Sequence, residues 1–145
     1  MYKVFWAITV FTVLVIAAGG LDSSSIAFAA TRHNETQFEK GLVQFSNQAN
    51  KSLPMTIDRN TRLDSTVAGP GNRLTYFYTL TNHSASQVNP PSFRTQHAPR
   101  IKQTVCGSSD MQSLMKKGMT AVYIYRTNDG KEVMRLDFAP SDCGY

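Results

Sequence analysis

The chain has 145 residues, of which 41% are hydrophobic and 17% charged, and 15 Lys and Arg against 10 Asp and Glu give a net charge of +5. From this length we expect one domain with a single modest core. The basic residues form no long run, so we expect a mildly basic, solvated surface, with attraction to an anionic partner or membrane as the alternative.

The N-terminus has the pattern of an export signal. Lys3 supplies a positive start, residues 4–18 form an almost unbroken apolar run, and Ala27-Phe28-Ala29 supplies an A-x-A cleavage site. We therefore expect a signal peptide over residues 1–29 and a single periplasmic or secreted domain over residues 30–145.

Two other readings of this segment are open. Cleavage could occur after Gly20, or the apolar run could be kept as a membrane anchor, although a membrane span needs about 20 apolar residues. A lipid-anchored form is not expected, because no cysteine stands just after the apolar run. Nucleic acid is a poor partner candidate for an exported protein.

The two cysteines, Cys106 and Cys143, are expected to form a disulfide bond, since an exported chain folds in an oxidising compartment. The bond would fix the C-terminal tail to the domain. We expect neither a redox role nor a metal site, because the chain has no C-x-x-C pair and two cysteines alone do not hold a metal.

Residues 35–52 have the pattern of a helix that ends before Pro54. Thr36 and Glu39 have the spacing of a capping box. One helical face carries the apolar residues Phe38, Leu42, Phe45 and Ala49.

Residues 55–67 alternate between apolar and polar, which predicts a long strand, bent or bulged near Arg59-Asn60. Turn-forming residues follow over 68–72, and residues 73–81 alternate again. These two segments are expected to form a hairpin.

Residues 92–105 are expected to be partly helical. Phe93, His97, Ile101 and Val105 share a helical face, whereas Pro99 should break or kink the helix or begin a new one. A short helix over residues 111–117 should follow, with a cap in residues 107–110 and an end at Gly118.

Residues 119–126 and 131–138 flank Asp129-Gly130, which predicts a hairpin with a two-residue turn. This turn fixes the strand register. It places six pairs opposite one another: Arg126–Val133, Ile124–Arg135, Val122–Asp137, Tyr125–Met134, Tyr123–Leu136 and Ala121–Phe138. The last three pairs are apolar and should face the helices.

The expected fold is α+β, in the order α-β-β-α-α-β-β. It comprises one four-stranded antiparallel sheet, made of two hairpins, with helices mainly on one face. Tyrosines that alternate along two strands (Tyr76, Tyr78, Tyr123 and Tyr125) are assigned to the core rather than to a surface that stacks nucleobases.

No catalytic motif is present. The chain has no G-x-S-x-G elbow, H-E-x-x-H pair or nucleotide-binding glycine pattern, and its three histidines share no ligand spacing. We expect no enzyme activity, metal or cofactor. The alternative, a small secreted hydrolase, would need His97 to meet Asp110 or Cys106 in a pocket.

The best candidate site is the face of the sheet away from the helices. Charged and apolar side chains from both hairpins should meet there to form a protein-binding surface: Arg62, Asp64, Phe77, Ile124, Arg126, Arg135 and Asp137. Charge reversal at Arg126 or Arg135 should then weaken binding with little change in melting temperature. An ordinary solvated face with cross-strand ion pairs is the alternative.

The central segment carries a specific set of residues: Leu53-Pro54, Asp58, residues 61–65 (TRLDS), 69–71 (GPG), 74–76 (LTY) and 78–80 (YTL). In these residues, and more weakly up to Cys143, the chain resembles a group of small exported bacterial proteins of unknown function. The resemblance implies an envelope or secreted protein and carries no activity. The architecture is also similar to that of secretion-system pilotins and secreted immunity proteins, although the missing lipid-acceptor cysteine departs from a lipidated pilotin.

Together these features predict a non-enzymatic periplasmic or secreted protein that binds another protein. Contact with a membrane is expected only if the N-terminal segment is retained as an anchor.

Overall fold

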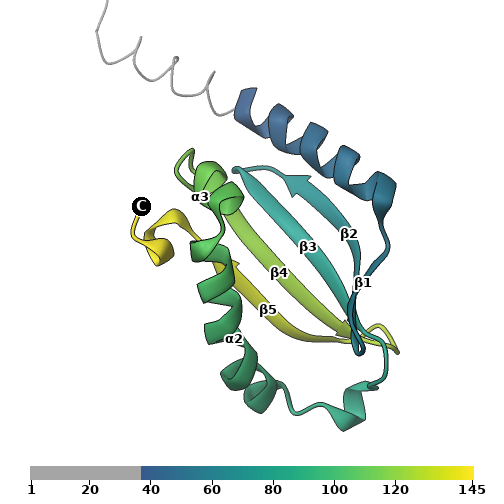
Figure 1. Cartoon of the computed structure of the whole chain (residues 1–145). Helices are drawn as coiled ribbons and strands as arrows, with labels where there is room; N and C mark the ends of the chain where they lie inside the picture. Colours follow the sequence, from purple (N-terminus) through teal and green to yellow (C-terminus); the bar gives the residue numbers. More distant parts are fainter. Residues whose placement is uncertain (1–36) are drawn as a thin grey trace, which may run out of the picture.

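The computed structural model describes residues 37–145 (Figure 1). The expected signal peptide, its cleavage sites and the alternative anchor lie outside these residues. Within residues 37–145, no helix is both long enough and apolar enough to cross a membrane.

A single five-stranded sheet forms the centre of the molecule, in the order β1 to β5. Its strands are β1 (Met55–Asp58), β2 (Thr61–Gly69), β3 (Arg73–Leu80), β4 (Thr120–Thr127) and β5 (Glu132–Phe138). The remaining elements are a helix over residues 37–49, η1 (Asn50–Ser52), η2 (Ala85–Gln87), α2 (Pro90–Gly107), α3 (Ser109–Met115) and η3 (Pro140–Cys143).

The expected α+β class is confirmed, but the expected four-stranded antiparallel sheet is wrong. Strands β3 and β4 run parallel, whereas the other neighbouring strands are antiparallel. The reason is the connection between them. The chain leaves β3, crosses one face of the sheet as α2 and α3, and returns to the end where β3 began, so both strands point the same way (Figure 1).

The fifth strand arises because residues 55–67 form two strands rather than one. The expected irregularity at Arg59-Asn60 is a tight turn that reverses the chain between β1 and β2. Asp58 Oδ1 accepts a hydrogen bond from the Asn60 N–H at 2.8 Å, as an Asx turn requires.

The β4–β5 hairpin has five of the six expected pairs, but Arg126 lies opposite Glu132 instead of Val133. The loop has three residues, not two. The Thr127 N–H donates to the Lys131 carbonyl at 2.9 Å, and Gly130 adopts a φ of 80°. A bulge at the start of β5 then restores the expected register.

The helix over residues 37–49 packs through Leu42, which is 1% exposed, and Ser46, which is 4% exposed. Phe45 was expected on this face, but it is 45% exposed. The Ser46 hydroxyl lies 2.9 Å from the Thr66 carbonyl of β2, so a polar contact fixes the rotation of the helix. Half of the expected capping box, Thr36, lies outside the described residues.

Helix α2 runs through Pro99 as one helix, so a break or a new helix at Pro99, two of the three expected outcomes, is wrong. Asn89 caps its start by accepting from the Ser92 N–H at 3.0 Å, and two prolines occupy its first turn. Pro99 is exposed and removes only one backbone hydrogen bond, which the helix tolerates at its surface. The expected cap of α3 is confirmed, because Ser108 accepts from the Met111 N–H.

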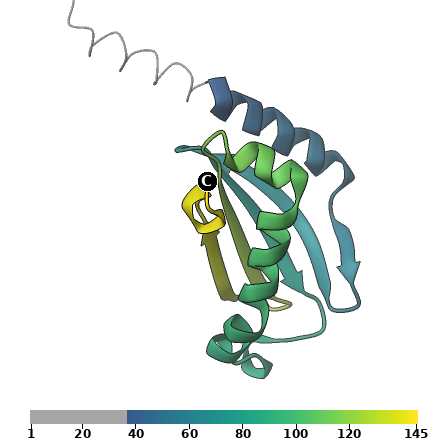
Figure 2. The same ribbon diagram turned by 60° about the vertical axis from the view of Figure 1, so that its left-hand side comes forward.

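The core lies between the sheet and the three helices, which cover the same face. Leu42 comes from the first helix, Val105 from α2 and Met115 from α3, and they pack with the apolar positions of β3, β4 and β5. In Figure 2 α2 runs along this face, while the helix over residues 37–49 lies near one end of the sheet.

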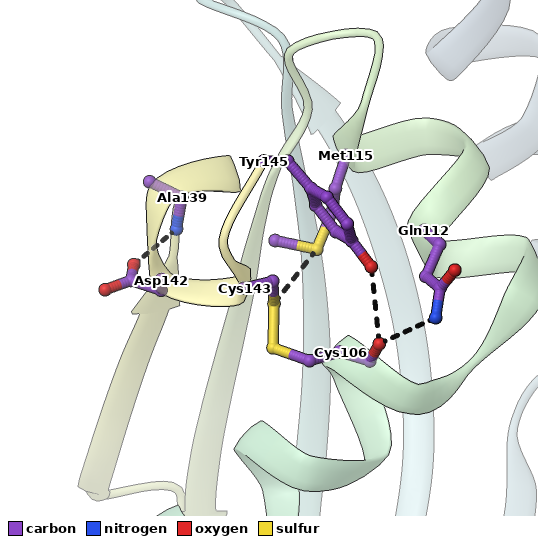
Figure 3. Close-up of a disulfide and its surroundings, with 7 residues drawn as sticks. All are labelled: Cys106, Gln112, Met115, Ala139, Asp142, Cys143 and Tyr145. Carbon is purple, nitrogen blue, oxygen red and sulfur yellow. Dashed lines mark hydrogen bonds between the residues drawn. A yellow bond between two sulfur atoms is a disulfide. The ribbon is translucent and has the colours of Figure 1, made fainter.

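The expected disulfide bond joins Cys106, at the end of α2, to Cys143 in η3, with a Cα–Cα distance of 5.3 Å. Further contacts reinforce this junction (Figure 3). The Cys106 carbonyl accepts from Gln112 Nε2 at 3.0 Å and from the Tyr145 hydroxyl at 3.5 Å. The C-terminal tail is thereby held against the ends of α2 and α3.

Candidate binding groove

A groove of about 670 Å³ lies between α2 and the strands β1 to β4. It exists because α2 packs over the β4–β5 side of the sheet, whereas the first helix packs at one end of β2. The remaining part of the helical face is left without a covering element among residues 37–145. The floor of the groove is aromatic, and its walls carry polar side chains.

A stack of tyrosines forms most of this floor. The parallel register places Tyr76 beside Tyr123 and Tyr78 beside Tyr125. The ring centroids of these pairs are 5.1 and 4.8 Å apart, with planes within 17° and 10° of parallel. Tyr76, Tyr123 and Tyr125 pack against the core as expected, whereas Tyr78 stacks on its tyrosine neighbours. All four are only partly buried, and Tyr78, Tyr123 and Tyr125 face the groove.

Burial keeps these tyrosines protonated well beyond neutral pH. It raises the pKa of Tyr76 and of Tyr125 to about 12 from the ordinary 10.0, and a smaller effect at Tyr125 comes from the nearby Asp58. Burial, and secondarily the neighbouring tyrosines, also raise the pKa of Tyr78 and Tyr123. The groove therefore presents neutral phenols.

Raising the pH from about 10 to about 12 is expected to unfold the protein. The unfolded chain releases these phenolic protons at lower pH than the folded protein does. Their contribution to stability is thus complete below pH 10 and is lost as the pH rises through the folded pKa. Phenolate absorbance should lag behind that of free tyrosine and then rise together with the loss of far-ultraviolet circular dichroism. A free-tyrosine titration with unchanged dichroism would contradict this.

Helix α2 supplies one wall of the groove. The His97 ring lies against Phe93, with 4.3 Å between ring centroids, and Phe93 meets Tyr125 edge-on at 6.0 Å. Gln96 and Arg100 are exposed along the same wall. The α2 segment contains two arginines and a lysine and no acidic residue.

The opposite wall comes from β1 and the turn that follows it. Ile57 is 49% exposed and presents an aliphatic surface, and Asp58 and Asn60 add polar groups. An aromatic floor between one basic and one mixed wall suits an apolar segment that also carries hydrogen-bonding groups.

The groove does not assemble the catalytic set considered from the sequence. His97 lines it, whereas Asp110 and Cys106 are not among its lining residues, and Cys106 is bound to Cys143. Among residues 37–145, no three His, Cys, Asp or Glu side chains are close enough together to hold a metal ion.

The residues expected to form a binding surface lie together on the other face of the sheet. The register places Arg62 opposite Thr79, Phe77 beside Ile124, and Ile124 opposite Arg135. We call this set the open face; its members are Arg62, Asp64, Phe77, Ile124, Arg126, Arg135 and Asp137. It is separated from the groove by the thickness of the sheet.

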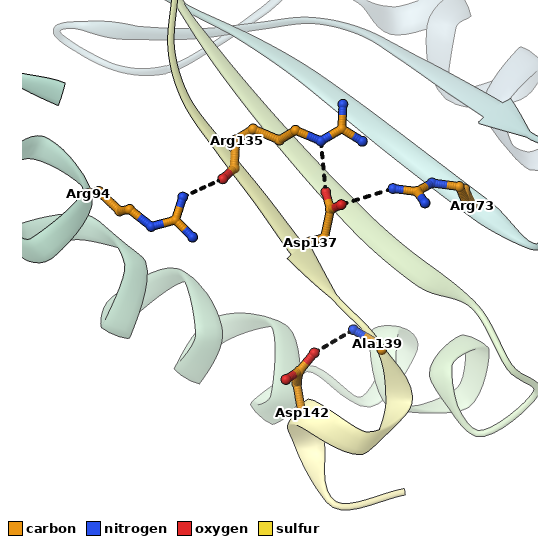
Figure 4. A network of polar contacts seen from close by, with 6 residues as sticks. All are labelled: Arg73, Arg94, Arg135, Asp137, Ala139 and Asp142. Atoms are coloured by element: carbon orange, nitrogen blue, oxygen red, sulfur yellow. Dashed lines mark hydrogen bonds and ion pairs between the residues drawn. The ribbon is translucent and has the colours of Figure 1, made fainter. Parts of the chain in front are cut away.

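Most charges on the open face are paired within the protein. Arg62 lies 2.5 Å from Asp64, which also accepts from the Thr79 hydroxyl. Asp137 lies 3.0 Å from Arg73 and 3.1 Å from Arg135 (Figure 4).

The remaining side chains of the open face also make their contacts within the protein. The Arg126 guanidinium lies over the Phe77 ring at 5.2 Å, and Ile124 is only 5% exposed. The arrangement is that of ion pairs on a solvated sheet, and a partner would have to compete with these contacts. As a binding surface, the open face stays a prediction.

Sequence reasoning missed the groove as a site. The spacing of Phe93, His97 and Ile101 gave the inward face of α2, and the alternating tyrosines gave one face of the sheet. The gap between α2 and β1 depends on where α2 crosses the sheet, and no local pattern encodes this position.

The family model described as "Domain of unknown function (DUF8479)" matches residues 36–135. No curated protein matches. Several solved structures share the fold.

One similar structure is a candidate secreted protein of Pseudomonas aeruginosa, with a TM-score of 0.64 and 16% identity over 76% of this chain and 96% of that one. Two others are pilotins of type II secretion systems: EpsS of Vibrio vulnificus and AspS of Vibrio cholerae. Both have a TM-score of 0.63 and 12% identity. EpsS covers 78% of this chain and 97% of its own, and AspS covers 79% and 99%.

Proposed function

Because the chain belongs to the DUF8479 family, whose description gives no function, we propose a role from its own surface. The protein is an exported, non-enzymatic domain that binds another protein of the bacterial envelope. It holds a segment of that protein in the groove between α2 and the sheet.

The groove is the observation that carries this proposal. It is concave, it has an aromatic floor, and Tyr78, Tyr123 and Tyr125 on that floor are neutral hydrogen-bond donors at physiological pH. Aromatic anchors in concave, desolvated surfaces contribute most of the affinity in protein interfaces. The open face offers instead an exposed set of charges that are already paired.

The fold comparisons support the envelope setting. A fold found in a candidate secreted protein and in two pilotins of type II secretion systems is used by proteins of the export machinery and its surroundings. The likeness in sequence is low, so these structures support only the envelope setting, and the binding role rests on the groove of this chain.

A groove-filling variant tests the proposal. Gln96→Trp places a large ring on an exposed position of the groove wall, and we expect it to reduce partner capture at least about tenfold, the effect of losing roughly 1.4 kcal/mol of binding. The full chain is expressed with a C-terminal tag in its host and recovered in oxidised form. Captured proteins are then quantified by mass spectrometry.

The matched control is Gln103→Trp, the same change at an exposed α2 position outside the groove lining. A third variant combines Arg126→Glu with Arg135→Glu on the open face. A partner lost only with Gln96→Trp supports the groove. A partner lost only with the double reversal, at an unchanged melting temperature, transfers the site to the open face. Equal capture by all variants contradicts both surfaces.

A further inference from the structure

The outer edges of the sheet differ in how far side chains from other elements occupy their backbone groups. An edge strand presents unpaired N–H and C=O groups that can pair with another chain, and proteins usually cover or block them. Two stretches of edge are blocked here by side chains, and one is not.

The first blocked stretch is the part of β2 that extends beyond β1. Asn50 lies beside Thr66, and its side-chain amide makes the hydrogen bonds that a neighbouring strand would make there. Its Oδ1 accepts from the Thr66 N–H at 2.7 Å, and its Nδ2 donates to the Thr66 carbonyl at 2.8 Å. Both backbone groups of this residue are therefore occupied.

The second blocked stretch is the outer edge of β5. The Arg94 side chain reaches from α2, and its Nη1 donates to the Arg135 carbonyl at 2.7 Å (Figure 4). An arginine in this position interrupts the row of backbone groups to which another strand would pair.

The outer edge of β1 has no such protection within residues 37–145. β1 pairs only with β2, and all four of its residues are exposed. Two of them are apolar: Met55 and Ile57 are each 49% exposed. β1 also forms a wall of the groove through Ile57 and Asp58.

We propose that the outer edge of β1 receives an extended segment of the partner protein as an added strand. Alternate side chains of this segment then point to the helical side of the sheet, cover Met55 and Ile57, and enter the groove. This inference rests on the proposed function and specifies how the partner is held.

The features of the site determine the chemistry of the segment. Its inward positions, every second residue, are apolar or aromatic, to match the tyrosine floor. It also carries an acidic side chain on the α2 side, because Arg100 and His97 line that wall and α2 contains no acidic residue.

A second copy of this chain is a weaker candidate for the same edge. β1 has only four residues, so two copies paired through β1 would bury well under the roughly 1,200 Å² that stable interfaces need. An extended segment that also fills the groove buries more surface than β1 alone provides.

The test uses a phage library of random dodecapeptides, panned against the immobilised, oxidised full chain. Enriched peptides are synthesised with a fluorophore, and their affinities are measured by fluorescence polarisation. We expect apolar residues at alternate positions of these peptides. We also expect Ile57→Lys to weaken their binding at least about tenfold, because a lysine on an edge strand opposes strand addition.

Val67→Lys is the matched control for Ile57→Lys. Val67 is also a β-branched residue on a strand, is 50% exposed, and lies outside the groove lining. This variant should bind the peptides as the native protein does. Unchanged melting temperatures of both variants show that a loss of binding is not a loss of folding.

The other outcomes separate this inference from the proposed function. Peptides that tolerate Ile57→Lys but not Gln96→Trp would overturn the strand addition and leave groove binding intact. Peptides that tolerate both variants, or a library with no enriched peptide, would overturn both. A native dimer that Ile57→Lys converts to a monomer in sedimentation would assign the edge to a second copy and overturn the inference.

Discussion

Replacing both cysteines, as Cys106→Ala with Cys143→Ala, is expected to lower the free energy of unfolding by about 4 kcal/mol. The bond closes a loop over a separation of 37 residues, and in the loop-entropy model this restricts the unfolded chain by that amount. For a domain of this size the melting temperature should fall by roughly 15 °C.

The measurement is urea unfolding followed by circular dichroism, with and without a reductant. The native protein should lose the same stability when it is reduced, whereas the double variant should not respond to the reductant. Equal midpoints for the oxidised native protein and the double variant would show that the contacts of η3 hold the tail without the bond.

The bond also bears on the groove. It fixes the C-terminal end of α2, and α2 forms one wall of the groove. Without the bond, Gln112 and Tyr145 still contact the Cys106 carbonyl, but these are partly exposed hydrogen bonds, each worth about 1 kcal/mol. We therefore expect reduction to loosen the tail before it displaces α2.

Local signals in the sequence predicted local structure well. Asp129-Gly130 between two alternating segments located the β4–β5 hairpin and most of its register. The error of one residue at Arg126 arose because Gly130 serves a three-residue loop as readily as a two-residue turn. Because of the bulge at the start of β5, the remaining pairs of the hairpin keep the expected register.

Long-range arrangement could not be read in the same way. The two hairpins were expected to be antiparallel neighbours, yet the direction of β4 relative to β3 depends on α2 and α3 crossing the sheet. The periodicity of Phe93, His97 and Ile101 gives the face of α2 that points inward. It does not give the strand over which the helix lies, and so it gives neither the parallel pair nor the groove.

The candidate site illustrates the same limit. All seven residues of the open face could be placed together because alternation along a strand determines the face on which a side chain lies. The pairing of Asp137 with Arg73 of β3 needs the β3–β4 neighbour relation and was not foreseen, whereas Arg135 lies two residues before Asp137 on β5.

Leu42→Ala is expected to lower the free energy of unfolding by about 3 kcal/mol, whereas Phe45→Ala should cost less than about 1 kcal/mol. Leu42 is 1% exposed and packs against the core, so its removal leaves a cavity beneath the first helix. Phe45 is the larger side chain, but it is 45% exposed and adds little to that packing. Urea unfolding of the two variants measures both values.

The two variants distinguish between the helix orientation predicted by the apolar pattern and the orientation seen in the structure. The pattern places Leu42 and Phe45 on one buried face and predicts the larger loss for Phe45. In the structure Ser46 points inward instead, because its hydroxyl donates to the Thr66 carbonyl. The side chain of Asn50 accepts from the Thr66 N–H and donates to the same carbonyl. A polar contact thus sets the rotation of an amphipathic helix. If Phe45→Ala proves the more damaging change, the helix is rotated toward Phe45 and the block on the β2 edge by Asn50 fails with it.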